Sequence, residues 1–196
     1  MVSALTIISG LRILEKAKPE HLHTVAYGSE VFPISQFNLW RKALPDARFI
    51  NLYGPTEATG MSCYYEVNRE ISEGEPIPIG KPFKNTEILL IDENGKCAEP
   101  GKEGEIYIRG TCVTMGYYKD DERTKLSFVQ NPLQDAYPEI VYKTGDMAYL
   151  NKLGELVFSA RKDHQIKHMG HRIELGEIEA ASDRLVSVRR ACSVYE

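Results

Sequence analysis

The segment Asn51–Glu57, with sequence NLYGPTE, carries groups of three chemical kinds within five residues. The ring of Tyr53 can stack on a base, the hydroxyl of Thr56 can bond a phosphate oxygen, and the carboxylate of Glu57 can ligate a hard cation such as Mg²⁺. A glycine–proline turn separates the ring from the other two groups. The same residues suit a plain loop with a capping threonine and a solvated glutamate, so spacing alone leaves both interpretations open.

A second candidate is the segment Tyr142–Asp146, with sequence YKTGD. It places a carboxylate directly after a glycine turn at the start of an expected hairpin. One carboxylate can accept hydrogen bonds from two neighbouring ribose hydroxyls, as it does in dinucleotide sites. The alternative is an ordinary turn at the start of a strand.

The third candidate, Arg161–Glu179, is dense in charge of both signs. It is either a solvated amphipathic surface or a basic strip that faces an anionic substrate and is attached at Asp163 to a hinge. Its three histidines lack the cysteines or paired acidic ligands of a metal site.

The first third of the chain must position the NLYGPTE segment, and its pattern alternates between helix and strand. Helical spacing of apolar residues predicts helices over 4–18 and 33–44, each with a proline after it. Short apolar segments predict strands over 23–27 and 48–53. This alternation is typical of a layered α/β architecture.

The pattern changes at residue 74, where closely spaced strands and turns begin. Strands are expected over 87–91, 105–109, 146–150 and 155–160, which together favour a small antiparallel barrel or sheet. A third unit starts near residue 161. It should contain short strands at 165–168 and 171–173, a helix through 178–185 and a last strand within 188–195.

Composition narrows the class of protein. Hydrophobic residues make up 42% and charged residues 27%, which is ordinary for a folded globular chain. The net charge of -4 and the scattered basic residues argue against nucleic acid or a membrane surface as partners. The four cysteines form no C-x-x-C pair, and no apolar run reaches the length of a membrane span. A reducing, cytoplasmic location is therefore expected.

Taken in order, the motifs resemble the successive core motifs of adenylate-forming enzymes. The resemblance is to an internal part of such an enzyme, and it rests on residues 51–57, 104–110 with 116–118, 142–146 and 161–179. The superfamily includes acyl-CoA synthetases, luciferases and the adenylation domains of peptide synthetases. The spelling RIELGEIE is most similar to the amino-acid-adenylating branch.

This resemblance implies both a fold and a reaction. Residues 1–162 would be the C-terminal portion of the large AMP-binding domain, α/β over 1–73 and β-barrel over 74–162. Residues 163–196 would be the hinge and the beginning of the small C-terminal domain, giving an α/β (α+β) class. A small carboxylate, plausibly an amino acid, would react with ATP and Mg²⁺ to form an acyl-adenylate. A phosphopantetheine thiol, on a carrier protein or CoA, would then take the acyl group.

The resemblance also assigns roles to residues. Tyr53 would pack against adenine, Asp146 and Arg161 would bind ribose, and Glu57 would ligate Mg²⁺. The whole nucleotide-binding set is Gly28, Ser29, Glu30, Asn51, Tyr53, Gly54, Thr56, Asp146 and Arg161. The catalytic set is Thr56, Glu57 and Lys167. Asp163 would be the hinge, with Lys167 and Arg172 facing the active site in the second step.

The acyl pocket of amino-acid-adenylating relatives maps onto uncharged positions, which favours a small or apolar substrate. These positions are Val25, Tyr27, Leu52, Gly60 and Met61. Tyr27 is bulky where many relatives carry a small residue.

The sequence departs from the family pattern in two places. No glycine-rich phosphate loop followed by lysine is present, and the lysine of the C-terminal domain would lie beyond Glu196. These residues alone are therefore expected to be inactive. Two alternatives stay open: a catalytically inactive module of the same fold that binds nucleotide or a partner, and a β-rich interaction domain without nucleotide.

Overall fold

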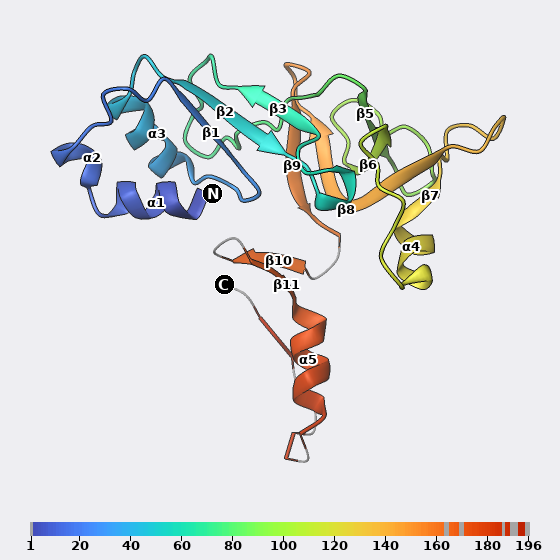
Figure 1. Cartoon of the computed structure of the whole chain (residues 1–196). Coiled ribbons are helices and arrows are strands. Elements are labelled where there is room, and N and C mark those ends of the chain that lie inside the picture. The colour runs from blue at the N-terminus through green and yellow to red at the C-terminus, as the bar shows by residue number, and fades with distance from the viewer. Residues whose placement is uncertain (1, 163–164, 169–170, 186, 189–191, 195–196) are drawn as a thin grey trace.

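The computed structural model describes residues 2–162, 165–168, 171–185, 187–188 and 192–194 (Figure 1). Two β-sheets lie side by side, with helices packed on the first, and the C-terminal segment projects away from both. The predicted fold class, a mixed α/β part followed by a curled antiparallel sheet, is confirmed. The predicted domain boundaries stay predictions.

The first sheet combines one parallel and two antiparallel pairings. Its strands lie in the order β1 (Thr24–Gly28), β2 (Arg48–Tyr53), β3 (Cys63–Glu66) and β4 (Lys81–Pro82). Strands β1 and β2 are parallel, and the helix α3 (Ile34–Ala43) connects them. This crossover brings the C-terminal ends of β1 and β2 to the same edge of the sheet. The two loops that the family resemblance assigns to nucleotide binding begin at that edge.

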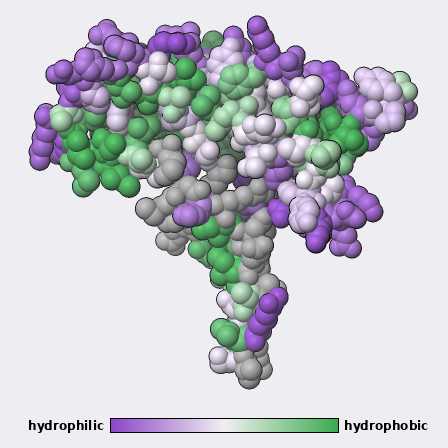
Figure 2. All heavy atoms as spheres, viewed as in Figure 1, coloured by the Kyte–Doolittle hydropathy of each residue, from purple (hydrophilic) through white to green (hydrophobic). Residues whose placement is uncertain are grey.

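The helix expected over 4–18 is in fact two helices, so this prediction was wrong in part. Helix α1 (Val2–Gly10) is followed by α2 (Ile13–Lys16), and Arg12 between them has a left-handed φ of 54°. Periodicity misses such a break because the apolar spacing continues across it. Apolar surface gathers over α1 and α2 (Figure 2), where Ile7 and Leu11 are exposed.

Aromatic side chains dominate the core between the helices and the first sheet. Tyr27, Phe32 and Phe37 contact one another through ring pairs with centroid separations of 5.0 to 5.9 Å. The indole nitrogen of Trp40 donates to the Leu5 carbonyl at 3.0 Å, which ties α3 to α1. Edge-to-face packing of this kind stabilises the ring cluster beyond simple burial.

The second sheet is antiparallel and curled (Figure 1). Its order is β5-β6-β8-β7, and β9 pairs with the second half of the long strand β8. The bounds are β5 (Thr86–Ile91), β6 (Gly104–Gly110), β7 (Phe128–Gln130), β8 (Ile140–Leu150) and β9 (Leu156–Arg161). A short helix, α4 (Asp121–Ser127), precedes β7 and was not expected from the sequence.

Hydrogen bonds join the two sheets. The Ile79 amide donates to the Leu156 carbonyl at 2.8 Å, and Gly80 forms a bridge with the same residue. Nearby, the Tyr65 hydroxyl on β3 donates to Glu155 at 2.6 Å. These hydrogen bonds hold the two sheets against each other, which positions the side chains that lie between them.

The C-terminal segment contains the expected hairpin and helix. They are β10 (Gln165–His168), β11 (His171–Glu174) and α5 (Leu175–Asp183). No strand is present among the described residues of 188–195, so the predicted last strand is not observed there. No helix in the described part of the chain is long and apolar enough to cross a bilayer.

Candidate functional site

Three side chains from the two sheets, those of Tyr53, Asp146 and Arg161, are joined through the Asp146 carboxylate. The Tyr53 hydroxyl donates to Asp146 Oδ2 at 2.6 Å, although the two residues are 93 positions apart. Arg161 Nη1 contacts Asp146 Oδ1 at 2.8 Å. The structure thus brings together the ring assigned to the base and both residues assigned to the ribose.

The backbone of β8 and β9 fixes this arrangement. Asp146 and Arg161 are register partners on the two strands. The Asp146 amide donates to the Thr144 hydroxyl at 2.9 Å, and that hydroxyl donates to the Ile106 carbonyl at 2.8 Å. Gly145 between them has a φ of 74°, a conformation that favours glycine. Tyr142–Asp146, expected from the sequence as a turn at the start of a strand, instead lies inside the long strand β8, where its register with β6 is irregular and the conformation of Gly145 fixes the Asp146 side chain.

The buried carboxylate of Asp146 has a counter-ion beside it. Asp146 is only 7% exposed, and the guanidinium of Arg161 offsets its charge. Burial, and secondly the negative charge of Asp146, raise the pKa of Tyr53 well above its ordinary value. Tyr53 therefore stays protonated and keeps donating, while the carboxylate retains lone pairs for further donors.

A cavity of about 620 Å³ opens beside the three side chains. This volume lies within the range of small-molecule sites. Its wall includes α1, the loop after β1, the end of β2 and residues from β8 and β9. The predicted residues on the wall are Ser29, Glu30, Asn51, Leu52, Tyr53, Gly54, Asp146 and Arg161.

Two glycines are required by close backbone approach at the cavity edge. A Cβ on Gly28 would lie 2.2 Å from the Leu52 carbonyl oxygen, and one on Gly54 would lie 2.1 Å from the Gly60 carbonyl oxygen. Neither distance is tolerable for a side chain. These glycines hold the loops after β1 and β2 in place, although Gly28 itself is not on the cavity wall.

The AMP-binding enzyme family matches residues 4–118 of the chain. The chain belongs to this family. It also spans about a third of the L-proline--[L-prolyl-carrier protein] ligase of Streptomyces coelicolor, with 38% identity over 184 residues that make up 91% of the chain. Bacitracin synthase 1 of Bacillus licheniformis is 39% identical over 82% of the chain, which corresponds to 3% of that synthase.

A solved structure agrees with these sequence relatives. PA1221, described as an NRPS protein containing adenylation and PCP domains, superposes with a TM-score of 0.81 at 33% identity. The match covers 90% of this chain and 36% of PA1221. The resemblance inferred from the motifs is therefore confirmed at the level of the AMP-binding enzyme family and its adenylation-domain relatives.

Thr56 and Glu57 lie on a single 3₁₀ turn, η1 (Thr56–Ala58), outside the cavity wall. Glu57 is 7% exposed, and its Oε1 accepts from the Tyr117 hydroxyl at 2.6 Å. Sequence reasoning noted Tyr117 within a family motif but gave it no role. Only the tertiary contact, across 60 positions, reveals it as the partner of Glu57.

The five acyl-pocket positions do not all reach the cavity. Leu52 lines it, whereas Val25 and Tyr27 are 6% and 2% exposed and belong to the aromatic core. The cause is the alternation of β1, which turns these two side chains toward α3. Gly60 and Met61 lie on the loop after η1, off the cavity wall. The assignment of these residues to an acyl pocket stays a prediction.

Removing the Tyr27 hydroxyl tests how this side chain is packed in the core. Its buried hydroxyl has no hydrogen-bond partner among the described residues, and burial raises its pKa well above the ordinary value. An unpaired buried hydroxyl is unfavourable. Tyr27→Phe is therefore expected to leave the free energy of unfolding unchanged or to raise it by up to about 1 kcal/mol in urea titrations.

The matched control is Tyr65→Phe, because the Tyr65 hydroxyl does have a partner, Glu155, at 2.6 Å. That variant should lose about 1–3 kcal/mol. Equal losses in the two variants would contradict the assignment of the Tyr27 hydroxyl as unpaired.

The remaining predicted residues lie in the C-terminal segment. Lys167 and Arg172 are register partners in the β10–β11 hairpin. Asp163, the predicted hinge, is outside the described residues. The roles of these three residues stay predictions.

Proposed function

We propose that the whole protein is an ATP-dependent ligase that activates a carboxylate as its adenylate and passes the acyl group to a thiol. The observation that carries the proposal is the meeting of Tyr53, Asp146 and Arg161 beside a cavity of about 620 Å³, in a chain of the AMP-binding enzyme family. The chain spans about a third of the proline ligase, so the activity of the whole protein is inferred by extension.

The nucleotide would occupy the cavity beside β2 and β8. The Tyr53 ring would pack against adenine, with Ser29 and Glu30 lining the other side of the base. Asp146 already accepts from Tyr53 and Arg161, and its remaining lone pairs can accept both ribose hydroxyls. The site thus fixes the sugar before chemistry begins.

The phosphates and metal would lie at η1. Hard oxygen donors suit Mg²⁺, which is commonly bound by one or two carboxylates together with substrate phosphates and water. Glu57 fits this requirement, because it is a carboxylate beside Thr56 and the Tyr117 hydroxyl holds its Oε1 in place at 2.6 Å. When bound, Mg²⁺ would neutralise charge on the phosphates. Thr56 would donate its hydroxyl to a phosphate oxygen.

The reaction would proceed in two balanced steps. A carboxylate oxygen attacks the α-phosphorus of ATP, the bond to the β-phosphate breaks, and pyrophosphate leaves. A thiol then attacks the acyl carbon, AMP leaves, and the thiol proton is released. The chain's own part is to hold sugar, base and phosphate in line, which is where most phosphoryl-transfer catalysis originates.

An amino acid is the proposed acid, and a carrier-bound phosphopantetheine thiol the proposed acceptor. Support comes from relatives named for L-proline and its carrier protein and for poly-L-ornithine. The apolar side chains Leu52, Ile77 and Ile79 on the cavity wall suit a small or apolar substrate. Asp163 is proposed as the hinge of the second step, with Lys167 and Arg172 contributing from the small domain. The four free cysteines favour a cytoplasmic setting.

ATP–pyrophosphate exchange by the full-length protein tests the proposal. Exchange should appear with one amino acid or a small group of related acids out of the proteinogenic set and a panel of short carboxylates. Binding of AMP without exchange for any acid would instead indicate an inactive nucleotide-binding module. Failure of both AMP binding and exchange would contradict the nucleotide site itself.

A further inference from the structure

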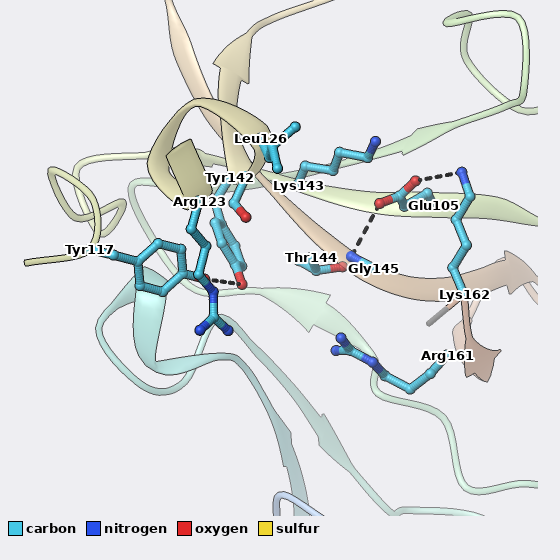
Figure 3. Close-up of a pocket in the computed structure, with 11 residues that line it drawn as sticks. Glu105, Tyr117, Arg123, Leu126, Tyr142, Lys143, Thr144, Gly145, Arg161 and Lys162 are labelled. Carbon is cyan, nitrogen blue, oxygen red and sulfur yellow. Dashed lines mark hydrogen bonds and ion pairs between the residues drawn. The ribbon is translucent and has the colours of Figure 1, made fainter. Parts of the chain in front are cut away.

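A second hollow, of about 370 Å³, is lined by residues of α4, β6, β8 and β9 (Figure 3). Four cationic side chains line it and only one carboxylate, that of Glu105. The four cations are Arg123, Lys143, Arg161 and Lys162. We call this the basic hollow. Arg161 and Lys162 are ion-paired with Asp146 and Glu105 at 2.8 and 3.1 Å, and Arg123 and Lys143 add two further positive charges to the lining.

The shape of the basic hollow is set by packed groups. The guanidinium carbon of Arg123 lies 4.5 Å from the centroid of the Tyr117 ring, a cation–π arrangement. The Tyr117 ring in turn packs edge-on against Phe128 at 5.7 Å. The Arg123 amide donates to the Asp120 side chain, which caps α4. Arg123 is therefore held at both its backbone and its side chain.

Two guanidinium groups face the same open space. Figure 3 shows Arg123 entering from α4 and Arg161 from β9, below the backbone of Thr144 and Gly145. Lys162 contacts Glu105 at 3.1 Å on the far side of the hollow, which offsets the single lining carboxylate. Planar guanidinium groups from two elements suit an oxyanion with several acceptor oxygens.

The basic hollow adjoins the cavity that contains the Asp146 carboxylate. Arg161 lines both spaces, and Gly145, which lines the basic hollow, directly precedes Asp146. A ligand whose sugar is held at Asp146 would therefore have a cationic space within reach of its phosphates. Tyr117 links the hollow to Glu57 as well, through the hydroxyl–carboxylate bond of 2.6 Å.

We propose that the basic hollow is a binding site for a polyphosphate anion of the pyrophosphate class, with Arg123 and Lys143 as ligand-contacting residues. The choice of a polyphosphate over another oxyanion rests on the proposed function, since it comes from the neighbouring nucleotide site. Either free pyrophosphate or the tail of a nucleoside triphosphate has the required chemistry.

Isothermal calorimetry with the 196-residue chain, at low salt and without divalent cations, tests the site. Inorganic pyrophosphate is the probe, with AMP and ATP titrated separately. Pyrophosphate should bind saturably, and Arg123→Gln and Lys143→Gln should each weaken it about tenfold, the effect of losing a charge-assisted hydrogen bond. Lys125→Gln removes the same charge from an exposed position on α4 and should leave the affinity unchanged. Circular dichroism melting confirms that each variant is folded.

The titrations distinguish free pyrophosphate from a triphosphate tail as the ligand, and they test the basic hollow separately from the proposed nucleotide site. ATP binding more tightly than AMP, with the difference lost in Arg123→Gln, would assign the site to a triphosphate tail. Equal affinities for ATP and AMP, with pyrophosphate bound by the wild type and weakened in Arg123→Gln, would assign it to free pyrophosphate. Absence of pyrophosphate binding, or equal binding by wild type, Arg123→Gln and Lys143→Gln, would overturn the inference even if AMP binds. Absence of AMP binding with pyrophosphate still bound would count against the proposed nucleotide site alone.

Discussion

Replacing Asp146 by alanine in the full-length protein is expected to raise KM for ATP at least tenfold in pyrophosphate exchange. The reason is the loss of a carboxylate that would accept both ribose hydroxyls, each such charged hydrogen bond being worth about 1.5–3 kcal/mol. Ribose contacts exist before and during the reaction, so binding should suffer more than kcat at saturating ATP.

In this experiment a loss of stability must be distinguished from a loss of ATP binding. Replacing Asp146 also removes its ion pair with Arg161, whose side chain is 19% exposed, so stability will fall as well. Asp146→Asn keeps the shape of the side chain and should show the same KM change with a smaller drop in melting temperature. Asp135→Ala, at an exposed carboxylate that precedes β8, is the matched control and should behave as wild type.

A further variant isolates the aromatic ring from its hydroxyl. Tyr53→Phe removes the 2.6 Å bond to Asp146 and keeps the surface proposed to pack against adenine. It should therefore change KM for ATP only a few-fold. Unaltered ATP kinetics in Asp146→Ala and Asp146→Asn would reject the ribose assignment, whatever the result for Tyr53→Phe.

The cavity proposed for the nucleotide was partly predictable from the sequence, because several of its residues lie in short motifs. The apolar residues before Gly54-Pro55 correctly place Tyr53 at the end of a strand, whereas Asp146, expected at the start of a strand, lies inside β8. The curled antiparallel sheet was predictable for the same reason, since each of its long strands ends at a recognisable turn.

The tertiary partners of these residues were not predictable. Tyr117 beside Glu57 and Tyr65 beside Glu155 are contacts across 60 and 90 positions, and no local pattern encodes them. Local patterns also fail where context overrides them. The apolar spacing of α1 continues past Arg12, although the backbone there turns left-handed. Tyr27 packs in the core against the ring of Phe37 on α3, a contact that its position in the sequence does not indicate, and its place in an acyl pocket stays a prediction.

The second large effect is expected at Glu155, which connects the two sheets. The Glu155 carboxylate accepts three hydrogen bonds. They come from Arg69 Nη2 at 2.8 Å, from the Tyr65 hydroxyl at 2.6 Å and from the side-chain amide of Asn151 at 2.8 Å. Its side chain is 17% exposed and that of Arg69 26%, so water screens the pair only in part. Arg69 also contacts Glu75, which makes this a network rather than an isolated pair.

The network makes stability depend on pH in a defined direction. Hydrogen bonding from Arg69 is the main cause that lowers the pKa of Glu155 from 4.5 to about 2. Because the folded-state pKa is below the unfolded one, the contribution to stability is complete above about pH 4.5. It is lost as the pH falls toward 2. A shift of this size corresponds to about 3 kcal/mol.

Glu155→Gln is therefore expected to lower the free energy of unfolding by about 2–3 kcal/mol at pH 7, with a difference from wild type that shrinks steadily below pH 4.5. Urea titrations from pH 2.5 to 7 measure this difference. Glu66→Gln is the control, since the Arg48–Glu66 pair has the same chemistry at 2.7 Å but side chains 60% and 42% exposed. The free energy of unfolding of that variant should change far less, because water screens the exposed pair. A pH-independent difference for Glu155→Gln would refute the assigned cause.

The same variant connects stability to the proposed function. Tyr53 lies on β2 in the first sheet and Asp146 on β8 in the second, so their contact depends on how the sheets are held together. The Glu155 network is a large part of that connection, together with the Ile79–Leu156 hydrogen bond. Glu155→Gln should therefore weaken AMP binding several-fold at a temperature where the variant is fully folded, although Glu155 is absent from the cavity wall. Unchanged AMP affinity would show that the remaining contacts between the sheets position Tyr53 and Asp146 without this network.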